Sequence, residues 1–343
     1  MDFTPTEAQA EARDLAAGIF ADLATHERLR AAGTGSDPEL WKALCGAGLV
    51  AAVEELGLLG LVLLLEEQGR TTAQVPYAAS CVYGRLAIAA HGTDEQRERL
   101  LPGIGDGSVV VAGAFPAQQG VRSGARGGLS GTVPVVPWLR DATHVLVADA
   151  GRRLWLVPLG EGTGTGTEEV ELTAPWSAGR LTLDEAPAET LGGADACSDV
   201  LATARTAFAG LQAGVCAGSL ARAVAHTNTR EQFGRPLATR QGVQLRAADA
   251  HMDTEAIRVT AYEAAWRRDA GLPYATHALT AAWWASEAGQ RVVHTGQHLH
   301  GGAGADVGHP VHRHFLWGRQ LDAYLGSGGE VLQELGELIA HGD

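Results

Sequence analysis

The first 108 residues have the apolar and polar spacing of a series of short helices. A helix is expected over Glu7 to Leu23, because Thr4 or Thr6 can cap it and a glutamate stands in its first turn. Pro38 suits the start of a second helix, since apolar residues follow it at i, i+3 spacing. Further helices are expected over Leu58 to Gln68, which is strongly apolar, and from Thr93, where acidic residues come first. The pattern predicts a helical N-terminal domain over residues 1–108.

From residue 109 the pattern changes to short runs of β-branched residues divided by glycine and proline, which is typical of strands. The expected strands are 109–112, 131–136, 144–148 and 153–157. The repeated Gly and Thr of residues 160–167 favour a surface turn or flexible loop. A middle β domain, a barrel or a sandwich, is therefore predicted over residues 109–195.

Long helices return from Ser198, where about 30 residues pass without a proline before Phe233. Three more helices are expected, at 241–270, 276–298 and 329–339. Residues 196–343 are thus predicted to form a four-helix bundle. The whole chain is assigned to an α+β multi-layer class, with a helical domain, a β domain and a second helical domain in that order.

Composition narrows the range of functions. The chain has 343 residues, of which 45% are apolar and 19% charged, as in soluble globular proteins. A net charge of −14 argues against binding to nucleic acids or anionic membranes, which require a cationic surface. The four cysteines have no CxxC spacing and are expected to be buried reduced thiols. The N-terminus lacks the basic and apolar segments of a signal peptide, so a cytoplasmic location is expected.

The most specific motif is Arg230-Glu-Gln-Phe-Gly-Arg-Pro-Leu-Ala-Thr-Arg-Gln241. It resembles the Arg-x-x-Phe-Gly-x-x-(Ile/Leu)-x-x-x-Gln signature of acyl-CoA dehydrogenases, flavoenzymes that desaturate acyl-CoA thioesters. The resemblance implies that Arg230, Phe233, Leu237 and Gln241 reach the FAD of a neighbouring subunit. A guanidinium suits a pyrophosphate because it offers paired donors. The alternative is an ordinary turn between helices with a surface arginine.

A second motif, His298-Leu-His-Gly-Gly-Ala-Gly304, resembles the family's Gln-x-x-Gly-Gly-x-Gly loop near the adenosine diphosphate half of FAD. Gly301 and Gly302 would let backbone amides approach phosphate oxygens, and His298 replaces the usual glutamine. A glycine-rich helix C-cap is the alternative. A metal site is a further alternative but lacks acidic or cysteine ligands at a suitable spacing. Its histidines would be His294, His298, His300, His309, His312 and His314.

The family's catalytic glutamate has no counterpart. The register that runs on from Gly301 places Leu325 at the usual position of this base, and Ala204 stands at the alternative position on the preceding helix. Neither side chain can accept a proton. The family's flavin-ring loops are also altered, because the matching stretches are Ala112 to Gln119 and Val135 to Pro137.

A chain that keeps the motifs for a neighbour's FAD but lacks the base and the flavin-ring loops resembles the non-catalytic subunit of actinobacterial α2β2 acyl-CoA dehydrogenases. Several of these enzymes act on steroid-CoA thioesters. The resemblance implies a catalytic partner subunit that shares FAD with this chain at their interface. One alternative is a homomeric protein of the same fold with altered chemistry, a dehydratase or cyclase, whose acid and base would be Asp306, Glu330 or His314. Another is a binding or scaffold protein without FAD.

Overall fold

The computed structural model describes residues 2–124 and 128–341 and contains two compact units. One unit is made of residues 27–61 and 74–204. The other combines the residues up to His26, the segment Val62–Ala73 and the residues from Arg205 onward. The predicted order of a helical region, a β region and a second helical region is confirmed. The boundaries of the three predicted domains remain a prediction.

The N-terminal region is helical, as predicted, and two of its caps were foreseen. Thr6 and Thr93 each form a capping box with the glutamine three residues later, Gln9 and Gln96. The strongly apolar helix is longer than expected and is interrupted at Gly57, whose φ is 72°. The helices are α1 (Glu7–Leu23), α2 (His26–Ala32), α3 (Pro38–Gly46), α4 (Val53–Thr71), α5 (Tyr77–Ala79), a π-helical turn (Ser80–Leu86), α6 (Ala87–His91) and α7 (Asp94–Asp106).

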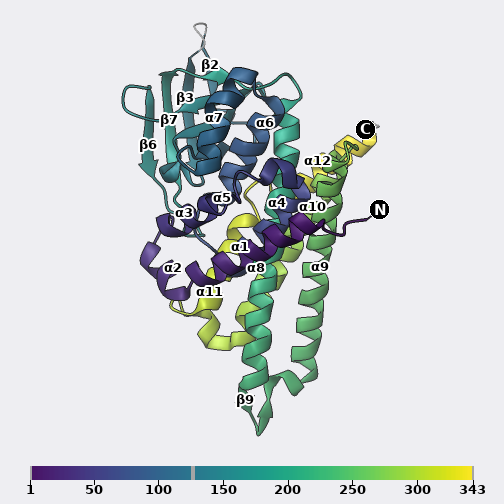
Figure 1. Cartoon of the computed structure of the whole chain (residues 1–343). Helices are drawn as coiled ribbons and strands as arrows, with labels where there is room; N and C mark the ends of the chain where they lie inside the picture. The colour runs from purple at the N-terminus through teal and green to yellow at the C-terminus, as the bar shows by residue number, and fades with distance from the viewer. Residues whose placement is uncertain (1, 125–127, 342–343) are drawn as a thin grey trace. The chain divides into compact units, whose positions relative to one another are not determined.

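The middle region is a sandwich of two four-stranded sheets, in the orders β1-β4-β5-β8 and β2-β3-β7-β6 (Figure 1). Apolar side chains from both sheets, among them Val133, Val145 and Leu181, are fully buried in one cluster between them. Only β1 and β4 pair in parallel among the described strands. The strands are β1 (Val111–Ala114), β2 (Arg122–Ser123), β3 (Leu129–Val136), β4 (His144–Ala148), β5 (Leu154–Pro158), β6 (Thr165–Glu169), β7 (Gly179–Ala186) and β8 (Glu189–Thr190).

The expected loop at residues 160–167 is partly wrong, because β6 begins at Thr165. The glycine and threonine residues of β6 are typical of a turn, but the segment pairs with β7 as a strand, with Thr165 opposite Leu183. β7 was not predicted, although its buried and exposed positions alternate over much of its length. β6 lies at the edge of its sheet, where β7 alone supplies its pairing.

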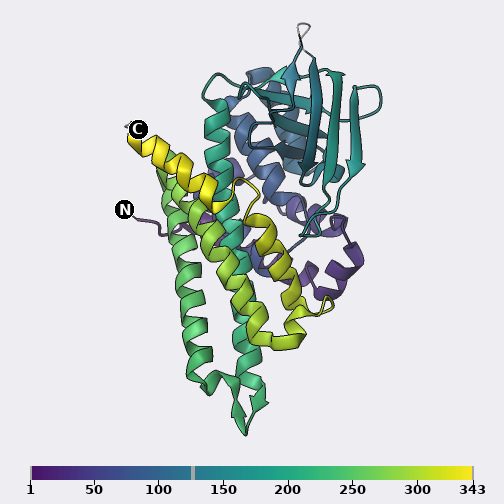
Figure 2. The same cartoon turned by 180° about the vertical axis from the view of Figure 1, so that it is seen from behind.

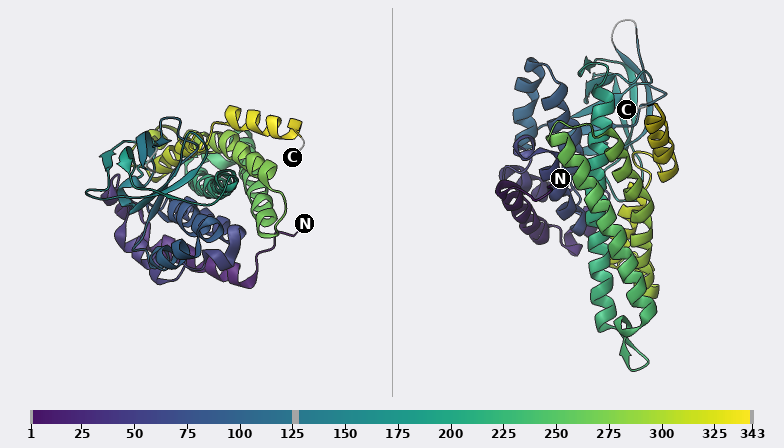
Figure 3. Two further views of the ribbon diagram at one scale, coloured as in Figure 1. Left: turned by 90° about the horizontal axis from the view of Figure 1, so that it is seen from above. Right: turned by 90° about the vertical axis from the view of Figure 1, so that its right-hand side faces the viewer.

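The C-terminal region contains five α-helices, one more than predicted. They are α8 (Ala196–Thr229), α9 (Gln241–Asp269), α10 (Ala275–His300), α11 (Pro310–Leu321) and α12 (Gly328–His341). α11 begins with Pro310, a residue typical of the first position of a helix, and is capped by the side chain of His309. Helices α9 and α10 pack along their lengths (Figures 2 and 3). Among the described residues α8 alone is long and apolar enough to span a membrane, but 72% of its apolar window is buried inside the protein.

Three glycines on one face of α8 let it approach the second half of α4 very closely. A Cβ at Gly214 would overlap the carbonyl of Glu66, and a Cβ at Gly218 would overlap that of Arg70. A Cβ at Gly210 would lie 2.7 Å from the side-chain Cγ1 of Val62. At Gly214 and Gly218, four residues apart, α8 thus meets the backbone of α4 directly, which only glycine allows.

The opposite relation holds between α8 and α10, where glycines on α10 receive polar side chains from α8. Gly289 accommodates the side chain of Gln212, and Gly296 that of Ser219. Both pairs are spaced by seven residues, so they lie on one seam of each helix. Helix α8 is therefore enclosed by tight contacts on more than one side.

We expect Gly214→Ala to lower the free energy of unfolding by about 1–3 kcal/mol, the usual effect of overpacking. The matched control is Gly18→Ala in α1, where a Cβ meets no atom within 4 Å. This control should raise the free energy of unfolding by about 0.5–1 kcal/mol, because alanine favours helix more than glycine does. Urea unfolding of both variants measures the difference. Equal effects of the two substitutions would contradict the close approach of α8 and α4.

Candidate functional site

A two-stranded hairpin joins α8 to α9 and carries part of the first motif. β9 (Glu231–Gln232) and β10 (Arg235–Pro236) pair across Phe233 and Gly234, whose φ angles are 54° and 76°. Two successive positive φ values match a tight primed hairpin turn, although phenylalanine is an unusual residue there. The ring of Phe233 is 90% exposed, and the Arg240 guanidinium lies 5.2 Å from its centroid. The hairpin (β9 in Figure 1) therefore presents an aromatic ring to the exterior.

Both motifs meet at one pocket of about 540 Å³. Five of the predicted cofactor residues line it, namely Arg230, Leu237, His298, Gly301 and Gly302. Gly301 has a φ of 62°, and a Cβ on it or on Gly302 would meet no atom of this chain within 4 Å. The backbone there is accessible to a bound group. Neither Phe233 nor Gln241 lines the pocket, and both are exposed.

The pocket also contains two histidines that the first motif did not reveal. His226 lies one helical turn before Arg230, and His300 is the last residue of α10. Partial burial lowers the pKa of His226, and the nearby His300 and Arg230 lower it further. The signal in the sequence was the i, i+4 spacing of His226 and Arg230, which places both side chains on one face of α8.

The space around Leu325 is nearly filled. Leu325 is 6% exposed and borders a cavity of about 20 Å³, which is enough for roughly one water molecule. Arg205 closes this space, since its guanidinium binds both carboxylate oxygens of Glu334 at 2.9 and 2.7 Å. Its Nε also donates to the carbonyl of Leu325 at 3.3 Å. Phe208 and Tyr324 add an edge-to-face aromatic pair with centroids 4.8 Å apart.

The predicted flavin-ring stretches lie in the β sandwich. Ala112 and Ala114 are buried in β1, and the cis peptide Phe115–Pro116 follows. The ring of Phe115 stacks on Tyr83 at 5.1 Å. In β3, Val135 is 39% exposed while Val136 is fully buried. Ala204, at the alternative position of the base, is also fully buried.

The residues proposed for altered acid–base chemistry have structural partners. Asp306 accepts a hydrogen bond from the amide of Gly308 in a turn. Glu330 accepts from the amide and hydroxyl of Ser327, which lowers its pKa. His314 is buried between the carbonyls of Pro310 and Arg70, and burial lowers its pKa to about 4. None of the three lines the space around Leu325. Within residues 2–124 and 128–341, no histidine, cysteine or carboxylate group forms a cluster able to hold a metal ion.

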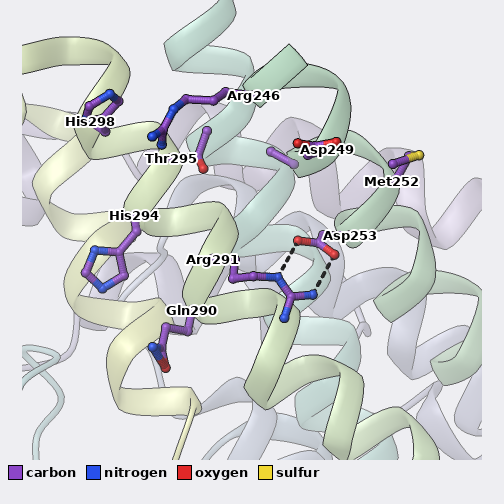
Figure 4. A pocket seen from close by; sticks show the side chains of 10 residues that line it. Arg246, Asp249, Met252, Asp253, Gln290, Arg291, His294, Thr295 and His298 are labelled. Carbon is purple, nitrogen blue, oxygen red and sulfur yellow. Dashed lines mark hydrogen bonds and ion pairs between the residues drawn. The ribbon is translucent and has the colours of Figure 1, made fainter. Parts of the chain in front are cut away.

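A second and larger groove, of about 810 Å³, lies between α9 and α10 (Figure 4). Arg291 crosses it to Asp253, with hydrogen bonds of 2.9 and 2.7 Å. Arg246 and His294 also line it. His298 lines this groove and the smaller pocket alike, so the two are adjacent.

Comparisons with known proteins agree with the motifs. Residues 6–108 match the model of the N-terminal domain of acyl-CoA dehydrogenases, and residues 192–335 match that of the C-terminal domain. The chain is 34% identical to the acyl-CoA dehydrogenase FadE27 of Mycobacterium tuberculosis, with 99% of both chains covered.

Two solved structures are similar over nearly the whole chain. The Tcur3481-Tcur3483 steroid ACAD variant is 44% identical with a TM-score of 0.92, covering 98% of each chain. The ChsE4-ChsE5 complex from Mycobacterium tuberculosis is 31% identical with a TM-score of 0.93, covering 100% of each chain. With its motifs, its fold and these relatives taken together, the chain belongs to the acyl-CoA dehydrogenase family.

Proposed function

We propose that this chain is the non-catalytic subunit of a heteromeric, FAD-dependent acyl-CoA dehydrogenase and completes the FAD site of a catalytic partner. One contrast carries the proposal. The pocket at Arg230 and Gly301 is open at about 540 Å³, whereas the space at Leu325 is reduced to about 20 Å³. The first can take part of a dinucleotide, and the second cannot take an acyl thioester.

The open pocket suits the adenosine diphosphate half of FAD. Arg230 supplies a guanidinium for a phosphate, and the backbone at Gly301 and Gly302 is free of side chains. His298 and Leu237 border the same space. When bound, FAD would supply the acceptor for the hydride that leaves the β carbon of the substrate. This chain's residues would hold and orient the cofactor, while the base that removes the α proton would come from the partner.

Exposed apolar side chains support a partner subunit. Leu245, Met252 and Val259 follow at seven-residue spacing along α9 and are 57%, 63% and 51% exposed. This spacing keeps them on one face of the helix. Exposed apolar side chains along one helix face are typical of a protein–protein contact, and the exposed ring of Phe233 adds a further apolar group on the hairpin. We propose an α2β2 assembly for the complex.

The relatives support a substrate class. One similar structure is a steroid ACAD and another is the ChsE4-ChsE5 complex. We therefore propose a steroid side-chain CoA thioester as the substrate, desaturated between its α and β carbons. We place the complex in the cytoplasm, in keeping with the acidic net charge of −14 and the buried position of α8.

The direct test measures flavin content. We expect this chain to lack the 450 nm flavin absorbance when purified alone and to contain FAD when co-purified with an acyl-CoA dehydrogenase partner that has the catalytic glutamate. The reason is that only part of an FAD site is available in each chain. A yellow homomeric preparation with full FAD occupancy would contradict the proposal.

Replacing Arg230 tests the phosphate contact. We expect Arg230→Ala to weaken FAD binding by the complex by about 1.5–3 kcal/mol, the scale of a hydrogen bond to a charged group. The matched control is Arg235→Ala, an exposed arginine of the same hairpin that does not line the pocket. Titration of FAD into the apo complex measures both affinities. An unchanged affinity in Arg230→Ala would place its guanidinium away from the cofactor.

A carboxylate restored at Leu325 should not restore activity. We expect Leu325→Glu, as a lone chain, to remain inactive, because the cavity of about 20 Å³ excludes the thioester and Arg205 would pair with the new carboxylate. Leu325→Gln is the control for packing without charge. The assay follows reduction of an artificial electron acceptor with long-chain and steroid-type CoA thioesters. Turnover by the lone Leu325→Glu chain would show an intact flavin and substrate site.

A further inference from the structure

Three histidine rings from three segments pack together at the open pocket. His226 on α8 stacks on His300 at the end of α10, with ring centroids 4.6 Å apart and planes inclined by 24°. The ring of His309, which caps α11, packs edge-on against the ring of His300, with centroids 4.9 Å apart. His226 and His300 line the pocket that also contains Arg230 and Gly301.

Hydrogen bonds fix where the protons lie in two of these rings. His300 Nδ1 donates to the carbonyl of Gly296 at 2.7 Å, so in the neutral ring Nε2 has no proton. His300 can offer a second N–H only after it takes up a proton. His309 Nδ1 accepts from the amide of Val311 at 3.2 Å and must remain unprotonated to cap α11. Because protonation of His309 Nδ1 would break this cap, His309 is not the site that takes up a proton.

The surroundings are mostly cationic. Arg230 borders the pocket, and Arg222 lies close enough to act on His309. Partial burial, followed by His300, lowers the pKa of both His226 and His309. The acidic group that opposes this effect at His309 is Asp306. Without an anion, these effects favour the neutral form of His226. An anion in the pocket would raise the pKa of His226 and favour its protonated form.

We propose that His226 and His300 form a proton-linked binding site for a nucleotide diphosphate, in which one proton is taken from solvent as the anion binds. The inference rests on the proposed function, since the diphosphate there is that of FAD. It adds His226, which lies outside both motifs, and pairs it with His300 of the second motif, and it makes cofactor affinity depend on pH. The added positive charge on the histidine pair would face the negative diphosphate, beside the guanidinium of Arg230.

The direction of the pH dependence follows from the proton balance. The chain without nucleotide binds fewer protons than the nucleotide-bound chain, because the nucleotide raises the pKa of the site. Nucleotide affinity therefore strengthens as pH falls from the pKa of the bound form to the lower pKa of the free form. One proton corresponds to at most about a tenfold change in affinity per unit of pH. Above this range the affinity is low and constant, because neither state holds the proton.

The test uses the full chain, labelled at histidine, with ADP-ribose as the probe. The diphosphate of ADP-ribose is diesterified and does not itself titrate near neutral pH. NMR titrations at several pH values should show ADP-ribose binding up to about tenfold more tightly for each unit that the pH falls. The histidine signals of His226 should titrate at higher pH when the probe is bound. His226→Gln should bind with little dependence on pH, and the exposed control His251→Gln should behave as the unaltered chain does.

Three outcomes would overturn the inference: affinity that is independent of pH, the same pH dependence in His226→Gln, or no binding at millimolar ADP-ribose. Each is distinguishable from failure of the proposed function. If the co-purified complex retains FAD and loses it in Arg230→Ala, the chain still serves a shared FAD site without the histidine pair. If the complex contains no FAD, the proposed function fails whatever the histidines do.

Discussion

The backbone contact between α8 and α4 is the constraint on which the helical unit depends. Gly214 brings α8 against the carbonyl of Glu66, and this closeness also buries the Glu66 side chain to 3% exposure. Burial raises the pKa of Glu66, while Arg258 on α9 opposes that rise through an ion pair of 3.0 Å. An isolated carboxylate at such a site would be very costly. The glycine contact therefore requires a cation from α9 at this level, and this ties three helices together.

The same helix bears two different environments on one unit. Near its far end, His226 and Arg230 border an open pocket, whereas Arg205 closes the space at Leu325 by binding Glu334. Arg205 is 7% exposed and has both carboxylate oxygens of Glu334 within hydrogen-bond distance, a geometry that compensates for its burial. The ion pair between Arg205 and Glu334 thus stabilises the packing around the nearly filled space. Leucine at position 325 is consistent with this packing, since it adds no charge that would compete for Arg205.

Local signals in the sequence predicted more of the fold than of the site. The caps at Thr6 and Thr93 were visible because a capping box is contained within four residues. Strand β6 was missed because its pairing partner β7 lies elsewhere in the chain and its own residues are typical of a turn. The meeting of Arg230 with Gly301 followed from a family resemblance. No local pattern could place His226 against His300, because the stacking depends on how α8 and α10 pack.

In the proposed non-catalytic role, the hairpin would give this chain a specialised contact surface. Phe233 holds a left-handed backbone conformation that costs about 1–3 kcal/mol for a residue with a side chain, and yet its ring is 90% exposed. Within the described part of the chain, the contact with Arg240 and the hydrogen bond from Arg240 to the carbonyl of Gln232 support this conformation. A ring fixed in advance loses little conformational entropy when another surface covers it. The strain therefore lies at an exposed position, where the partner subunit of the proposed complex would gain from a rigid contact.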